Sequence, residues 1–115
     1  MKDIKIALIQ THWPGSREKI AASYRQLVRE AAASGAQVVC LQEFALSPYF
    51  ASTIDPHNRR WAEPLQGGVS ERTFSDMARE NGIFLVVTQY RLHHVPYPGI
   101  VFFPKSIILA QDPVR

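Results

Sequence analysis

The stretch SGAQVVCLQEF, residues 34–44, contains the signals that decide the fold. Gly35 stands where a helix C-cap glycine belongs, directly after a helical pattern. Residues 38–41 form a short apolar run with two valines, which is typical of a buried strand. Glu43 then places a carboxylate where the run ends and an aromatic loop begins. The stretch predicts a helix end, a strand and a loop that opens with an acid.

The residues before this stretch complete a βαβ pattern. Residues 4–9 are apolar and β-branched, so we expect a mostly buried strand that ends at the turn residues 13–16. Residues 17–34 carry apolar side chains at three- and four-residue spacings, as one face of a helix does: Ile20, Tyr24, Leu27, Val28, Ala31 and Ala32. Strand, helix and strand in this order predict a crossover between two parallel strands.

The residues after it predict a second helix and more strands. A loop rich in proline, glycine and aromatic residues occupies positions 44–69. Ser70 is expected to cap a helix whose inner face is Phe74, Met77 and Ala78, and residues 83–88 are expected to form a third strand. Residues 100–103 and 106–110 predict a hairpin that turns at Pro104-Lys105. The fold class is α/β, in the order β-α-β-loop-α-β, then a hairpin.

Length and composition limit the classes of protein. A chain of 115 residues with 46% apolar and 20% charged residues fits one globular domain. The net charge of +3 is spread along the chain, and Arg59-Arg60 is the densest basic pair, so we expect neither a nucleic-acid nor a membrane partner. One cysteine, no signal-peptide core and no apolar run long enough to span a bilayer predict a cytoplasmic location.

Glu43 is the leading candidate for chemistry. Functional groups gather beyond the carboxyl ends of parallel strands, and an apolar environment raises the pKa of a carboxyl group toward values useful for a general base. The alternative is a solvated carboxylate, or one paired with an arginine. Cys40 lies three residues earlier, and strand alternation turns it to the opposite side of the sheet from Glu43. We therefore interpret Cys40 as a small buried hydrophobe and not as a nucleophile.

Other motifs are missing or uninformative. No spacing of histidine, cysteine or acidic residues matches a zinc or calcium site, and no phosphate loop or Gly-x-Ser-x-Gly is present, so we expect neither a metal nor a cofactor. Four aromatic residues either line a pocket or serve as packing: Trp13, Tyr49, Phe50 and Trp61.

Two segments resemble a known family. IKIALIQTHWPGSREKIAASYRQLVREAAASGAQVVCLQEFALSPYF, residues 4–50, is similar to the start of nitrilase-superfamily carbon–nitrogen hydrolases. AEPLQGGVSERTFSDMARENGIFLVV, residues 62–87, resembles the next segment of that family. LQEFALSPYF is most similar to the branch of N-carbamoylputrescine amidase and β-ureidopropionase. The likeness covers residues 4–91, so we divide the chain into an N-terminal hydrolase part, 1–91, and a divergent tail, 92–115.

The resemblance implies a fold, a site and a substrate class. The family fold is an α-β-β-α sandwich, of which this chain would be a truncated part, and family members commonly dimerise. The family site is a Glu-Lys-Cys triad in which a thiolate attacks the carbon of an amide or ureido group. By motif position Glu43 matches the general base, and Tyr49 and Phe50 are candidate substrate contacts. The implied substrate is a small N-carbamoyl compound or amide.

The resemblance also predicts what this chain lacks. The catalytic lysine and nucleophilic cysteine are not identifiable, since Lys105 precedes the expected lysine position and Cys40 lies in the wrong strand. We therefore expect a chain without hydrolase activity of its own, whose sheet exposes a face or an edge and favours self-association. One alternative is a non-enzymatic remnant that acts as an interaction or dimerisation module. Another is a flavodoxin-like binding domain, which residues 13–16 fit poorly.

Overall fold

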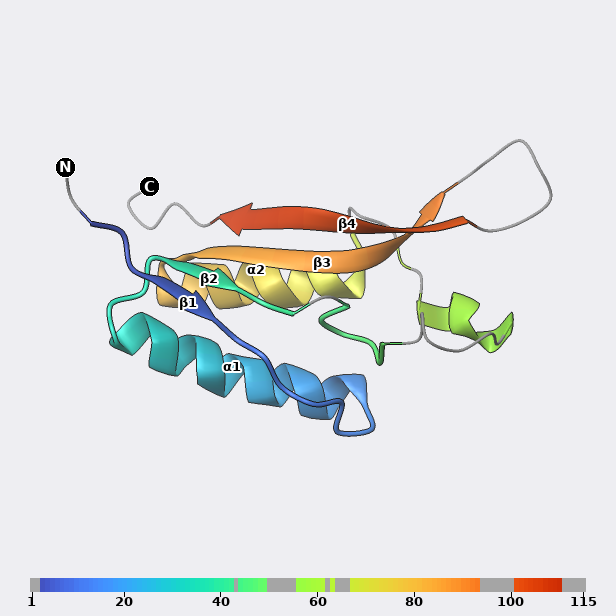
Figure 1. Cartoon of the computed structure of the whole chain (residues 1–115), viewed down its shortest axis with the longest axis horizontal. Helices are drawn as coiled ribbons and strands as arrows, with labels where there is room; N and C mark the ends of the chain where they lie inside the picture. Colours follow the sequence, from blue (N-terminus) through green and yellow to red (C-terminus); the bar gives the residue numbers. More distant parts are fainter. Residues whose placement is uncertain are drawn as a thin grey trace.

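The chain folds into one sheet with two helices packed on it (Figure 1). The computed structural model describes residues 3–42, 44–49, 56–61, 63, 67–93 and 101–110, with the backbone alone for 56, 58, 59, 88–93 and 101–110. The elements are, in order, β1 (Ile6–Leu8), α1 (Arg17–Ala33), β2 (Val38–Cys40), the 3₁₀ helix η2 (Pro56–Trp61), α2 (Val69–Asn81), β3 (Phe84–His93) and β4 (Val101–Ala110). No helix in these ranges is long and apolar enough to cross a membrane.

The sheet has the order β1-β2-β3-β4, with β1, β2 and β3 parallel and β4 antiparallel to β3. The predicted α/β class and parallel crossover are confirmed. The hairpin forms between β3 and β4, and the predicted turn at Pro104-Lys105 is wrong, because both residues lie inside β4, opposite Tyr90 and Gln89. Proline is tolerated there because β4 is an edge strand of the described sheet.

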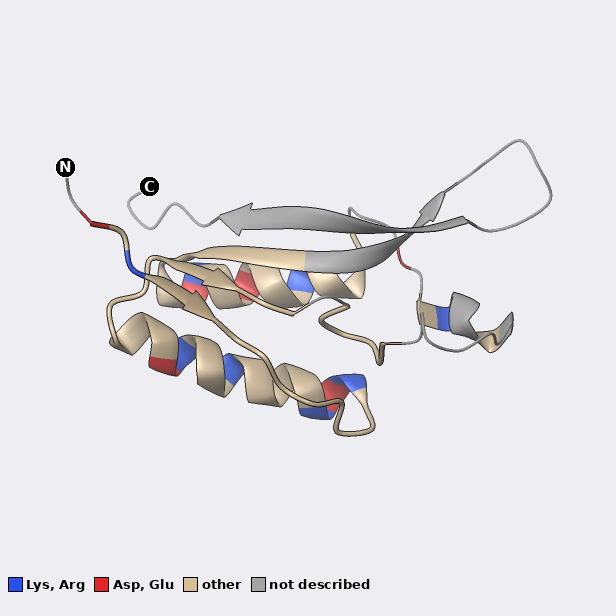
Figure 2. Cartoon of the chain, in the orientation of Figure 1, with Lys and Arg blue, Asp and Glu red and all other residues tan. Residues whose placement is uncertain are grey.

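Both helices begin and end close to the predicted positions. Ser16 caps α1, with its hydroxyl oxygen accepting the amide of Lys19 at 3.2 Å. The C-cap of α1 is Ser34, one residue before the predicted Gly35, which follows it in the left-handed conformation with φ 95°. Helix α2 starts earlier than expected: its N-cap is Gly68, so the prediction of Ser70 as N-cap is wrong. Both helices carry acidic and basic side chains (Figure 2).

The core lies between the helices and one face of the sheet. The paired residues Ala7, Val39 and Leu85 point toward the helices, and Val39 and Leu85 are fully buried. The core takes Ile20, Ala21, Tyr24 and Val28 from α1, and Phe74, Met77 and Ala78 from α2. The other predicted residues of the α1 face, Leu27, Ala31 and Ala32, are partly buried and pack against this core. The rings of Tyr24 and Phe74 meet edge to face, 5.8 Å apart, and join the two helices.

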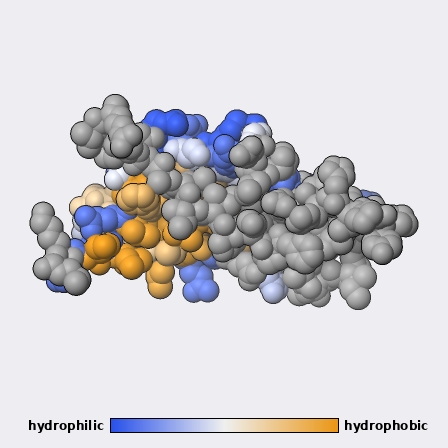
Figure 3. All heavy atoms as spheres, turned by 90° about the horizontal axis from the view of Figure 1, so that it is seen from above, coloured by the Kyte–Doolittle hydropathy of each residue, from blue (hydrophilic) through white to orange (hydrophobic). Residues whose placement is uncertain are grey.

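The opposite face of the sheet is open over β1 and β3. Two cross-strand rows point away from the helices: Ile6, Val38 and Phe84, and Leu8, Cys40 and Val86. Ile6 is 58% exposed, Leu8 80% and Phe84 49%. Apolar side chains are prominent on this surface (Figure 3). The prediction of a mostly buried first strand is therefore wrong, because a strand that is apolar on both sides needs two covering layers and the described residues supply one.

Candidate functional site

The candidate site lies beyond the carboxyl ends of β1 and β2. Glu43 and Phe50, the predicted general base and one predicted substrate contact, lie outside the described residues. Residues next to Glu43 show how the two strand ends are joined. The amide of Ile9 donates to the carbonyl of Cys40 at 2.9 Å, and the amide of Thr11 donates to Oε1 of Gln42 at 2.7 Å. The segment before Glu43 is thus fixed to the segment that follows β1.

A strained turn follows Glu43. Phe44 has φ 55°, in the left-handed region that bulky side chains rarely adopt, and its side chain is only 3% exposed. The amide of Ser47 donates to the Phe44 carbonyl at 3.1 Å, and Ala45 and Leu46 are buried beside it. Such backbone conformations cost about 1–3 kcal/mol, persist where the surroundings enforce them, and cluster at functional sites.

Three of the four aromatic residues singled out in the sequence are described, and they lie in different surroundings. Trp13 and Trp61 meet edge to face at 5.5 Å, although they come from the loop after β1 and from η2. Tyr49 is 59% exposed and its ring lies 5.1 Å from that of Phe44. An exposed ring next to the strained turn is compatible with substrate contact, which stays a prediction for Tyr49.

Glu63 is a buried carboxylate that the sequence reading missed. It is 8% exposed, and its Oε1 accepts the amide of Ser70 in the first turn of α2 at 2.7 Å. Its Oε2 lies 3.7 Å from Nη2 of Arg17, the first residue of α1. Glu63 therefore takes the place of a side-chain cap for α2, whose N-cap Gly68 offers none. A cap seven residues away follows no local capping pattern, so no sequence signal could have identified it.

Arg17 connects this carboxylate to the turn. Its Nε–H donates to the carbonyl of Leu46 at 3.2 Å, and its guanidinium lies 5.1 Å from the ring centroid of Trp61. Arg60 stacks on the same indole at 5.0 Å. Leu46 and Trp61 also line a small cavity of about 10 Å³ together with Glu63, enough for one water molecule.

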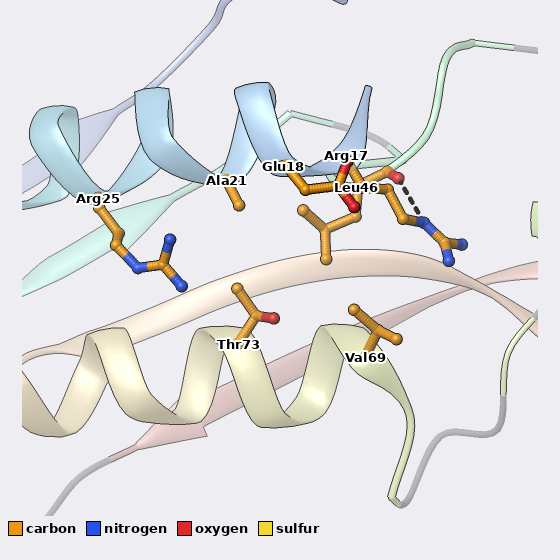
Figure 4. A pocket seen from close by; sticks show the side chains of 7 residues that line it. All are labelled: Arg17, Glu18, Ala21, Arg25, Leu46, Val69 and Thr73. Carbon is orange, nitrogen blue, oxygen red and sulfur yellow. Dashed lines mark hydrogen bonds between the residues drawn. The ribbon is translucent and has the colours of Figure 1, made fainter. Parts of the chain in front are cut away.

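A second hollow lies between the two helices (Figure 4). This groove of about 360 Å³ is lined by Arg17, Glu18, Ala21, Arg25, Leu46, Val69 and Thr73. Arg17 and Arg25 stand near its two ends, and the guanidinium of Arg17 turns toward the Leu46 carbonyl. The size suits a small ligand. The groove lies on the helix side of the sheet and meets the candidate site at Arg17 and Leu46.

Two other polar groups, the Tyr24 hydroxyl and the Cys40 thiol, lie away from the candidate site. Burial raises the pKa of the Tyr24 hydroxyl well above its usual value, in the core between the helices. Cys40 is a half-buried free thiol on the open sheet face. Within the described ranges no group of three metal-ligating side chains gathers.

Comparisons with known proteins agree with this architecture. The sequence profile of the carbon–nitrogen hydrolase family matches residues 5–112. No curated protein matches the chain significantly.

Solved structures share the fold. Nit3 of Saccharomyces cerevisiae, described as a member of branch 10 of the nitrilase superfamily, superposes with a TM-score of 0.73 and 23% identity over 93% of this chain and 40% of its own. A carbon–nitrogen hydrolase from Helicobacter pylori G27 gives 0.69 and 22%, over 76% and 30% of the two chains. An amidase from Nesterenkonia sp. gives 0.56 and 20%, over 76% and 32%.

This chain thus spans 30–40% of the length of these three structures. At such identities the structural likeness establishes the shared fold, and the profile match over most of the chain establishes the family. The chain belongs to the carbon–nitrogen hydrolase family.

Proposed function

We propose that this chain is the part of a carbon–nitrogen hydrolase domain that supplies the general base, Glu43, for hydrolysis of a small N-carbamoyl compound or amide in the cytoplasm. In the complete domain a cysteine thiolate attacks the substrate carbon, and the base takes and returns the proton. The observation that carries the proposal is the family match over residues 5–112, because it supports the resemblance of LQEF to the family's general-base motif.

The surroundings of Glu43 support this role. The residues on each side of it are held, Gln42 by the amide of Thr11 and Phe44 by burial in a strained turn. A base must keep a fixed position relative to the group that it deprotonates. The thiol chemistry is consistent with the Nesterenkonia amidase, one variant of which is described with acrylamide added at the active-site cysteine.

The first prediction concerns the purified 115-residue chain. It is expected to release no ammonia above background from N-carbamoylputrescine or N-carbamoyl-β-alanine, because its sole thiol, Cys40, lies on the open sheet face within β2. A coupled ammonia assay at high enzyme concentration measures this. Turnover that scales with chain concentration and survives repurification would contradict the assignment of the missing groups.

A chimera tests Glu43 directly. Residues 1–93 of this chain would replace the corresponding part of the Nesterenkonia amidase, and ammonia release from a small amide would be followed. Glu43→Gln in an active, folded chimera is expected to lower the rate about 100- to 10,000-fold, the usual contribution of a general base. Glu80→Gln, an exposed change on α2, is the matched control. Equal rates for both variants would exclude Glu43 as the base.

The open sheet face favours a second candidate function, a dimerisation module. The exposed residues Ile6, Leu8 and Phe84 form a continuous apolar surface around Cys40 and Val86. Exposed apolar patches mark interaction sites in soluble proteins. The occupant proposed here is a second copy of the chain, packed face to face as two sheets pack in a sandwich.

Leu8→Lys tests this dimer. Full burial of a leucine side chain contributes about 1.5–3 kcal/mol, and a dimer of two copies buries two of them, so the variant is expected to weaken self-association at least about 100-fold in analytical ultracentrifugation. Ala22→Lys, an exposed change of equal charge on the outer face of α1, serves as control. The proposed dimer would cover the Cys40 thiol, so its labelling should slow as protein concentration rises in the wild type and in Ala22→Lys. Leu8→Lys should label at one rate. A chain that stays monomeric and labels at one rate at every concentration would rule the dimer out.

A further inference from the structure

We propose that Arg17 and Glu63 form a tie that holds the strained turn behind Glu43, which makes them positioning residues for the candidate base. The claim that the turn positions a general base rests on the proposed function. The tie itself is a property of this chain and is tested without turnover.

Glu63 is the fixed end of the tie. Its carboxylate is buried and receives the Ser70 amide at 2.7 Å on one oxygen and the Arg17 guanidinium at 3.7 Å on the other. Ser70 and Arg17 stand in the first turns of α2 and α1. One carboxylate therefore joins the starts of both helices, where the helix dipoles favour negative charge.

Arg17 carries the tie to the turn. Its planar guanidinium uses two separate arms, Nε–H to the Leu46 carbonyl at 3.2 Å and Nη2 toward Glu63. The indole of Trp61 lies 5.1 Å from the guanidinium carbon and restricts its movement. Lysine has a single ammonium group and no fixed fork, so it cannot reproduce this geometry.

The turn needs such a restraint. Leu46 lies two residues after Phe44, whose φ of 55° is unfavourable for a bulky residue. The Ser47 amide, bonded to the Phe44 carbonyl at 3.1 Å, closes the turn and reports whether it is formed. The small cavity beside Glu63 is also lined by Phe44 and Ser47, so the carboxylate and the turn are in direct proximity.

Glu63→Gln separates the tie from the helix cap. The amide oxygen of glutamine still accepts the Ser70 amide, while the charge that attracts Arg17 is lost. Residue-resolved hydrogen exchange on the full 115-residue chain measures both amides. The expected result is exchange at Ser47 at least tenfold faster, with Ser70 changed less than threefold.

Arg17→Lys is the second variant, and it should also speed exchange at Ser47 tenfold because the two-armed contact is lost. Asp76→Asn is the matched control, since it removes an exposed ion pair of 3.0 Å with Arg79 on α2 and should leave Ser47 unchanged. The proposal would be overturned if Ser47 exchanged at the wild-type rate in either Glu63→Gln or Arg17→Lys. It would also be overturned if exchange became faster to the same extent throughout α1 and α2. None of these readouts depends on Glu43, so failure of the chimera and failure of the tie are distinguishable.

Discussion

Replacing Phe74 by alanine is expected to lower the free energy of unfolding by about 3–5 kcal/mol. Phe74 is fully buried, and its ring meets that of Tyr24 edge to face at 5.8 Å, so it joins α2 to α1 beneath the sheet. Its removal loses apolar burial, leaves a cavity and breaks the ring pair. Domains are stable by about 5–15 kcal/mol in total, so this loss is a large part of what holds the chain folded. Urea unfolding followed by far-ultraviolet circular dichroism measures it.

Phe84→Ala is the matched control for this prediction. Phe84 is also a phenylalanine but is 49% exposed on the open face of β3, so we expect a loss below about 1.5 kcal/mol in the monomer. Measurements at low protein concentration keep self-association from adding to its effect. If the two variants lost equal stability, the core would not lie on the helix side of the sheet.

Much of the fold could be predicted because its signals are local. The burial of Ile20, Tyr24 and Val28 follows from their spacing on one helix, and that of Phe74 and Met77 follows in the same way. Each of these spacings lies within a single helix, so no contact with a distant part of the chain is needed to recognise it. The parallel order of β1 and β2 then follows from the length of the crossover that joins them.

The errors arise where distant parts of the chain decide the outcome. Glu63 and Arg17 are 46 positions apart, and neither has a local pattern that indicates a partner. Proline favours a turn in the sequence, and only the three-dimensional structure shows that Pro104 lies in a strand at the edge of the sheet. Likewise the exposure of Leu8 depends on whether a second layer covers β1, which strand composition cannot reveal.

Glu43 is a case in which the sequence predicts a role that the described residues do not test. The end of an apolar strand predicted a functional acid there, and the resemblance gave that acid a role as general base. The structure adds the held neighbours Gln42 and Phe44, which bracket the position. The role of Glu43 itself stays a prediction, and the chimera is the experiment that addresses it.

Replacing Tyr24 by phenylalanine is expected to stabilise the chain by about 1 kcal/mol at pH 7. The hydroxyl oxygen of Tyr24 is buried, and none of the groups that the structure describes forms a hydrogen bond with it. A buried polar group without a partner costs about 1–3 kcal/mol, whereas phenylalanine keeps the ring contact with Phe74. Urea unfolding of both proteins at pH 7 gives the difference.

The same substitution should matter more at alkaline pH. Burial raises the pKa of Tyr24 in the folded chain, while in the unfolded chain it ionises near its usual value of about 10. Above that pH the unfolded state binds fewer protons than the folded state, so the stability of the wild type falls by about 1.4 kcal/mol per pH unit through this group. Tyr24→Phe lacks this loss, and its advantage should therefore grow to about 2 kcal/mol near pH 11. Tyr49→Phe is the control, because it removes the same hydroxyl from a residue that is 59% exposed. An advantage of Tyr24→Phe that stays constant from pH 7 to pH 11 would mean that the Tyr24 hydroxyl is not buried between the helices.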